Sequence, residues 1–105
     1  MKKYRMVISP LAWDRVRRNQ WVLDGFNPTY SNRVRRELSD TLREIRQNPY
    51  LFPLDESDGL PEKKYRRALF AKWYKIIYQV TENTIYVNTV VDCRMDPETI
   101  HRELE

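Results

Sequence analysis

The sequence has few of the residue types on which common functional sites depend. Its 105 residues include one cysteine, two glycines and one histidine. One cysteine excludes an intrachain disulfide, and together with one histidine it provides too few ligands for a structural zinc site. Two isolated glycines cannot form a glycine-rich loop that cradles phosphate groups. We therefore expect no cofactor and no metal ion.

Long apolar segments are also missing from the sequence. No run of residues is apolar and long enough to cross a bilayer, and the first residues show no apolar secretion signal. We therefore expect a soluble, cytoplasmic protein with no membrane partner. The length predicts a single domain over residues 1–105, and a composition of 41% hydrophobic and 12% aromatic residues argues against disorder.

Positive charge is concentrated in one short segment. The net charge is +4, and the stretch from residue 63 to residue 75 contains six cations and no acid. These cations are Lys63, Lys64, Arg66, Arg67, Lys72 and Lys75. The preceding segment, DESDGLPE, contains four acids and no cation, and we interpret it as a solvated loop. A basic cluster beside an acidic loop indicates an anionic partner at a defined place, although a solvated charged surface is the alternative.

Two helices are predicted in the first half of the chain. Ser9 and Pro10 form a helix start, and this helix should run to about Asp24 and stop at Gly25. A second cap and proline, Asn27-Pro28, begins a helix that ends before Asn48-Pro49. Its apolar residues recur at helical spacing and make one stripe. They are Tyr30, Val34, Leu38, Leu42 and Ile45. The short connection predicts an antiparallel hairpin.

Alternating apolar and β-branched residues predict four strands. They cover residues 3–9, 65–71, 73–80 and 84–91, and a short helix should follow from Asp96. The expected fold is α+β in the order β-α-α-β-β-β-α. A helical hairpin would cover one face of a four-stranded, mostly antiparallel sheet. Because neighbours in a strand point to opposite faces, Arg66 and Arg67 should lie on different sides of this sheet.

These residues together resemble a known family. The element order, ISPLAW after the first strand, LREIRQNP at the end of the second helix, YRRALFAKWYKIIYQV and VVDCRMDPETI are similar to the RelE/ParE superfamily of bacterial toxins. The resemblance covers the chain from about Tyr4 to Leu104, and its most specific parts are YKIIYQV and Arg94. It implies the toxin component of a type II toxin–antitoxin module, held inactive by a cognate antitoxin protein.

The resemblance implies two possible targets. RelE-like members cleave mRNA on the ribosome, whereas ParE-like members inhibit DNA gyrase by binding and need no hydrolytic site. We favour the mRNA endonuclease. The gyrase inhibitor remains the alternative, because the helical hairpin is long and a strict alignment on YQV places Phe70 at one catalytic arginine position. A non-toxic basic RNA-binding domain is the third hypothesis.

The family match also implies candidate site residues. The catalytic candidates are Arg66 or Arg67 for the single cation of the second strand, Arg94 after the last strand, and His101. The nucleic-acid-binding candidates are Lys63, Lys64, Lys72, Lys75 and Tyr74.

The chemistry of RNA cleavage suits these residue types. It requires an activated 2′-hydroxyl, a neutralised phosphate and a protonated 5′ leaving oxygen. Arginine binds two phosphate oxygens with its planar fork, and histidine exchanges protons near neutral pH. Other interpretations remain open: His101 as an ordinary surface residue, Arg94 as a partner of Asp92 or Asp96, and Tyr74 as a core residue rather than a base-stacking one.

Overall fold

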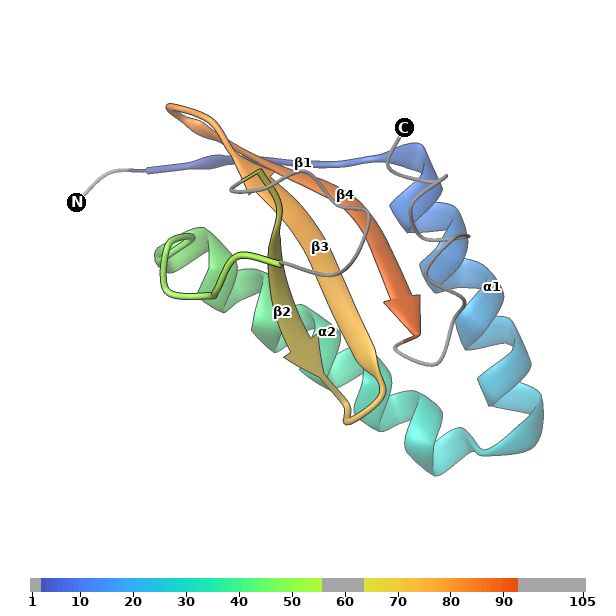
Figure 1. The fold of residues 1–105 in the computed structure, drawn as a ribbon. Helices are drawn as coiled ribbons and strands as arrows, with labels where there is room; N and C mark the ends of the chain where they lie inside the picture. Colours follow the sequence, from blue (N-terminus) through green and yellow to red (C-terminus); the bar gives the residue numbers. More distant parts are fainter. Residues whose placement is uncertain (1–2, 56–63, 93–105) are drawn as a thin grey trace.

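The computed structural model describes residues 3–55 and 64–92. It contains β1 (Arg5–Ile8), α1 (Pro10–Phe26), α2 (Pro28–Gln47), β2 (Arg66–Phe70), β3 (Tyr74–Val80) and β4 (Thr84–Asp92). The predicted order of these elements and the α+β class are confirmed (Figure 1). The predicted C-terminal helix, together with Lys63, Arg94 and His101, lies outside the described residues.

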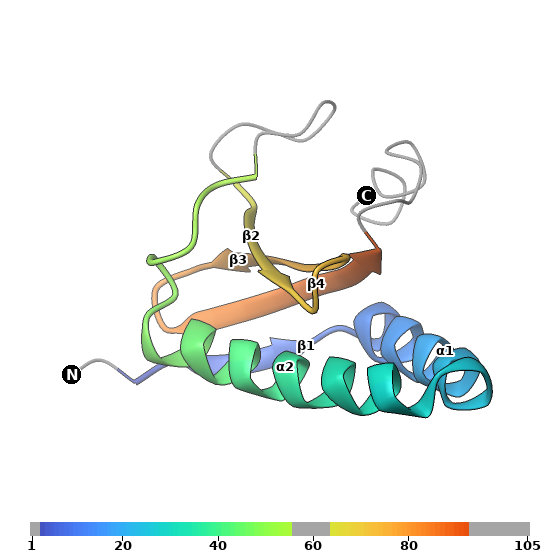
Figure 2. The same ribbon diagram turned by 90° about the horizontal axis from the view of Figure 1, so that it is seen from below.

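The four strands form one mixed sheet in the order β1-β4-β3-β2. β3 pairs antiparallel with both β2 and β4, whereas β1 pairs parallel with β4. Figure 2 shows α1 and α2 on the same side of this sheet. The chain can pair β1 with β4 in parallel because the two helices carry it across that face before the last three strands form a meander.

Side-chain caps determine where both helices begin. The turn between the helices lies two residues later than the sequence predicted. The Ser9 hydroxyl accepts a hydrogen bond from the Ala12 N–H, which starts α1. α1 continues through Gly25 and ends at Phe26, so the predicted stop at Gly25 was wrong. Asn27 is the reason: its N–H donates to the Leu23 carbonyl, while its side chain accepts from the Tyr30 N–H at the start of α2. One residue therefore ends one helix and begins the next.

The core lies between the helices and the sheet. The stripe of α2 packs on apolar side chains of β2, β3 and β4, as predicted. A bulge pairs Ile77 with Thr89 but Tyr78 with Val87, which leaves Asn88 as an extra residue in β4. This extra residue returns Val87 and Val90 to the same, helix-covered face, where both are buried.

The opposite face of the sheet carries a different set of residues. It includes Arg67 and Leu69 in β2, and Lys75 and Ile77 in β3, which pair across the two strands. Ile77, Thr89 and Val91 are buried although they point away from the helices. Among the described residues, no helix is both long and apolar enough to span a membrane.

Candidate anion-binding site

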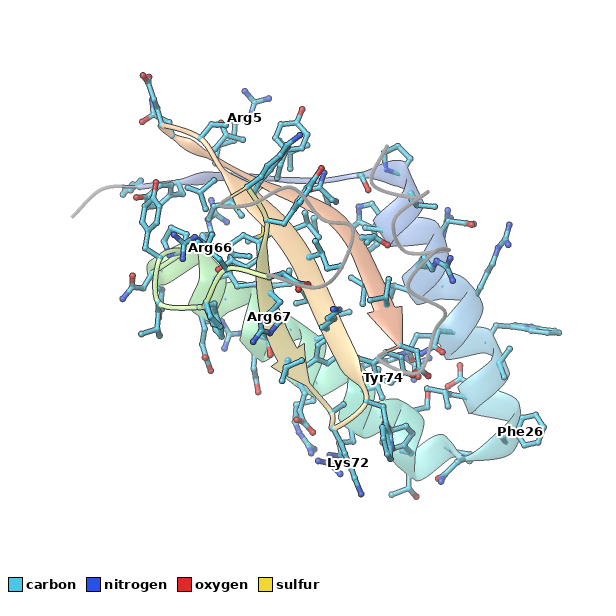
Figure 3. All side chains as sticks on the ribbon, in the orientation of Figure 1. Arg5, Phe26, Arg66, Arg67, Lys72 and Tyr74 are labelled. Atoms are coloured by element: carbon cyan, nitrogen blue, oxygen red, sulfur yellow. The ribbon has the colours of Figure 1, made fainter. Side chains whose placement is uncertain are left out.

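Arg66 and Arg67 do not act together, because they leave β2 toward opposite faces of the sheet. Arg66 pairs with Tyr78 on the helix-covered face, and its guanidinium donates to the Phe52 carbonyl at 2.7 Å. The same guanidinium lies 5.0 Å from the centre of the Tyr50 ring. Arg66 therefore holds the chain that follows α2, and the predicted separation of Arg66 and Arg67 on the two faces of the sheet is confirmed (Figure 3).

Arg67 and Lys75 converge on a single carboxylate on the other face. The Lys75 ammonium lies 3.0 Å from one oxygen of Asp55, and an Arg67 guanidinium nitrogen lies 4.0 Å from the other. The Asp55 side chain is fully buried, while Lys75 is 12% exposed and Arg67 is 37% exposed. These three side chains form the candidate anion-binding site, in which two cations face one buried anion.

The segment that delivers Asp55 lies along the outer edge of β2. This edge segment comprises residues 52–55, and Leu54 forms a single antiparallel bridge with Arg66. Two backbone hydrogen bonds join it to β2: the Arg67 N–H donates to Pro53, and the Asp55 N–H donates to Tyr65. The Arg67 guanidinium also donates to the Leu54 carbonyl at 2.8 Å. The edge segment thus covers part of the free edge of β2 and brings its carboxylate to the cations.

Sequence reasoning misplaced Asp55, which it assigned to a solvated acidic loop. Asp55 is buried and paired, so the prediction is wrong for this residue, while the rest of DESDGLPE lies outside the described residues. The available signal was the apolar stretch YLFPL just before it, which indicates a segment packed against the domain. Only the fold shows that its partner is a lysine 20 positions later.

The remaining described cations of the basic cluster lie elsewhere. Lys64 lies over the ring of Tyr65, and Lys72 lies over the ring of Trp73, each at about 5 Å from the ring centre. Lys72 is at the tip of the β2–β3 turn, where its φ of 69° is left-handed (Figure 3). The cluster is therefore spread along β2 and its turn, and only Arg67 and Lys75 approach a common anion in the described part of the chain.

The tyrosines of β3 belong to the core and do not offer a base-stacking surface. The Tyr74 ring stacks on Phe70 at 5.5 Å, and its hydroxyl exchanges hydrogen bonds with the Asn19 side chain. This burial corrects the assignment of Tyr74 to nucleic-acid binding and confirms the core interpretation.

Tyr78 is also unsuited to proton transfer. Its buried hydroxyl donates to the Pro49 carbonyl at 2.7 Å. Burial raises the pKa of Tyr78 to about 12, against the opposing effect of the Arg66 charge. The hydroxyl therefore stays protonated at neutral pH, and it can act neither as a base nor as a ready acid. No group of metal-ligating side chains occurs among residues 3–55 and 64–92.

A second feature is an exposed apolar surface on α1. We use the name α1 surface for its exposed apolar residues, which are Trp13, Trp21, Val22 and Phe26. They are spread around the helix and do not form one stripe, because successive residues of a helix are turned by about 100°. Trp21 is 81% exposed and Phe26 is 86% exposed, although residues of this size are normally buried. Val22 also lines a cleft of about 360 Å³ between the helices and the sheet. The three exposed aromatic rings of α1 are available for contact with a partner.

Comparison with known proteins gives no further assignment. No family model matches the sequence, and no curated protein matches it.

Proposed function

We propose that this protein is the toxin of a type II toxin–antitoxin module and that it is a ribosome-dependent mRNA endonuclease. The observation that carries the choice of RNA is the convergence of Arg67 and Lys75 on one anionic group. A guanidinium fork and an ammonium group within reach of the same two oxygens suit a phosphate as well as a carboxylate. The observed element order, which agrees with the family resemblance, supports the toxin class.

The proposed mechanism gives each group one task. Arg67 and Lys75 neutralise the phosphate charge as it develops during attack by the 2′-hydroxyl. Arg94 adds a further cation, a water molecule takes the proton of the 2′-hydroxyl, and His101 gives a proton to the 5′ leaving oxygen. Lys75 pairs with Val91, so the end of β4 lies beside the anion-binding site, and Arg94 follows Asp92 by two positions in the sequence. Arg66 keeps a structural task at Phe52.

The test is mRNA integrity in a purified translation reaction, mapped at single-nucleotide resolution. New 5′ ends should appear only when both ribosomes and the protein are present. Arg67→Ala should lower the cleavage rate about 10²- to 10³-fold, the usual effect of removing one group that stabilises a developing anion. Arg43→Ala is the matched control, because Arg43 forms only an exposed ion pair with Asp40 on α2. Intact mRNA with the wild-type protein would refute the proposal.

A specific observation favours a second candidate, the gyrase inhibitor. The α1 surface exposes three aromatic rings on the first helix of the hairpin, and this supports a function that works by binding alone. Inhibition of gyrase supercoiling at saturating protein, with mRNA left intact, would establish this function. Growth arrest on induction without an antitoxin is expected of both candidates and would exclude a non-toxic RNA-binding domain.

A further inference from the structure

The buried carboxylate of Asp55 occupies the place where a phosphate would bind. Its two oxygens face two different cations, Lys75 at 3.0 Å and Arg67 at 4.0 Å. A phosphate presents paired anionic oxygens to guanidinium and ammonium groups in the same manner. With two positive charges and one negative charge, this set of three side chains keeps one positive charge in excess.

The attachment of Asp55 differs from that of the strands around it. β3 and β4 pair along seven residue positions, whereas the edge segment has one isolated bridge with β2. It is also held by two backbone hydrogen bonds and by Phe52, which packs against the core. Three further contacts come from cations: Arg66 binds Phe52, Arg67 binds Leu54, and Lys75 binds Asp55. A competing anion would therefore weaken the contacts that hold the segment in place. Segments with few backbone bonds also open at a lower free energy than the sheet itself.

We propose that Asp55 is an internal competitor for a phosphate-binding site formed by Arg67 and Lys75. The site is closed while the edge segment lies on β2, and it binds the phosphate of an RNA chain when the segment leaves. The identification of RNA as the source of the phosphate rests on the proposed function, whereas the site itself does not. Asp55 would thus set a threshold that a ligand must overcome before the two cations can act.

The first consequence concerns inorganic phosphate and stability. In Asp55→Asn, Lys75 loses its buried partner, and no other carboxylate among the described residues is paired with Arg67 or Lys75. An anion that binds the folded state should then raise the melting temperature, because binding to the native state alone stabilises it. We expect phosphate to raise the melting temperature of Asp55→Asn clearly more than that of the wild-type protein. Sodium chloride at equal ionic strength separates binding from screening.

Two variants serve as controls for the phosphate effect. Asp24→Asn makes the same change at an acid that pairs with Arg35 and accepts from Ser31, away from the site. It should respond to phosphate as the wild-type protein does. The double variant Asp55→Asn with Lys75→Met removes the site's ammonium group, and it should lose the added response.

The second consequence concerns RNA. A short single-stranded RNA should bind Asp55→Asn between about 5- and 150-fold more tightly than wild type, the usual range for the release of a coupled contact. Cleavage of ribosome-bound mRNA should increase as well. If Asp55→Asn binds phosphate and RNA but mRNA stays intact, the proposed function fails and the phosphate site stands. If mRNA is cleaved but Asp55→Asn shows no added phosphate response, the internal competitor is refuted and the function stands.

Loss of folding is also informative. If Asp55→Asn is unfolded in chloride, phosphate should restore its circular dichroism spectrum. Failure of phosphate to do so, when the double variant is folded, would overturn the proposal. Failure of both variants to fold would also overturn it, since the edge segment could then not leave a stable domain.

Discussion

The anion-binding site and the α1 surface depart from the usual distribution of residues in opposite ways. At the site, a carboxylate is fully buried and the side chain of its lysine partner is only 12% exposed, although charged groups are rarely buried. On α1, a tryptophan and a phenylalanine are more than four-fifths exposed, where large apolar groups are rare. The first region therefore contains charge that the fold must compensate. The second contains apolar area that the fold leaves uncovered.

The two regions should contribute to different properties of the protein: the anion-binding site to the stability of the fold, and the α1 surface to the binding of a partner. The buried ion pair contributes to the folded state only while both partners remain, since either charge alone is strongly disfavoured in the interior. The side chains of the α1 surface have little to lose on unfolding, because they are already in contact with solvent. Substitutions in the two regions should therefore change different measured quantities, and the following predictions use that difference.

The largest effect on stability is expected for Lys75→Met. This change removes the ammonium group that lies 3.0 Å from the fully buried Asp55 carboxylate, and the nearest Arg67 nitrogen, at 4.0 Å, is too far away to replace its hydrogen bond. The free energy of unfolding should fall by about 3–5 kcal/mol, as it does when one partner of a buried pair is deleted. Urea denaturation measures this free energy of unfolding. The control is Arg43→Met, in an exposed ion pair, which should change the free energy of unfolding by less than about 1 kcal/mol. An equally small loss for Lys75→Met would contradict the argument from the buried pair.

A smaller effect is expected where the chain leaves α2 toward the edge segment. Tyr78→Phe removes the donor to the buried Pro49 carbonyl and should lower the free energy of unfolding by about 1–3 kcal/mol at neutral pH. Equal stability of the two proteins at pH 7 would show that this carbonyl finds another donor.

The same tyrosine gives a pH dependence with a defined sign. The pKa of Tyr78 rises from 10.0 to about 12 on folding, so between these values the unfolded chain loses a proton that the folded chain keeps. The contribution of this residue is therefore complete below pH 10 and is lost as pH rises toward 12. The stability difference between wild type and Tyr78→Phe should shrink over this interval. A difference that is constant from pH 9 to pH 12 would contradict the pKa shift.

Much of the fold follows from local patterns. α2 has a proline start, an apolar stripe and an asparagine cap at each end, and both of its predicted ends are confirmed. The strands follow from alternation, and the faces of Arg66 and Arg67 follow from their neighbouring positions. The bulge at Asn88 could not be predicted from local residue preferences. It places both Val87 and Val90 against the helices, and this depends on how the helices pack on the sheet.

The site was less accessible to sequence reasoning for a physical reason. Charge runs indicate where cations are, but not which of them meet an internal acceptor. Lys75 and Asp55 are 20 positions apart, and their contact depends on the edge segment lying on β2. The same limit applies to Tyr74, whose strand pattern fits either face until the helices are placed. Contacts between residues far apart in the sequence determine the surroundings of both Asp55 and Tyr74.

A fourth prediction concerns Lys72, the cation at the β2–β3 turn. Its φ of 69° is unfavourable for a residue with a side chain, by about 1–2 kcal/mol in the left-handed region. Lys72→Gly relieves this strain. Two effects oppose the gain: glycine loses more conformational entropy on folding, which costs about 0.5–1 kcal/mol, and the contact of the lysine with Trp73 is lost. We expect a net gain of about 0.5 kcal/mol or less in urea denaturation. Lys72→Ala keeps the strain, so a gain of equal size there would contradict this explanation.

The smallest effect on stability is expected on the α1 surface. Trp21→Ala combined with Phe26→Ala should change the free energy of unfolding by no more than about 0.5 kcal/mol, because both side chains are exposed. Leu23→Ala on the same helix is the matched control. Leu23 is partly buried against the core, so this change should lower the free energy of unfolding by about 1–2 kcal/mol. A large loss in the double variant would mean that these rings support the fold.

The same double variant then separates the two candidate functions. If the protein acts by cleaving RNA through Arg67 and Lys75, the variant should keep ribosome-dependent cleavage, because the α1 surface contributes nothing to phosphate binding. If it acts by binding gyrase through exposed apolar area, inhibition of supercoiling should be lost while the urea midpoint is unchanged. Loss of cleavage in a fully folded double variant would place the α1 surface in contact with the ribosome, and the two regions would then share one function.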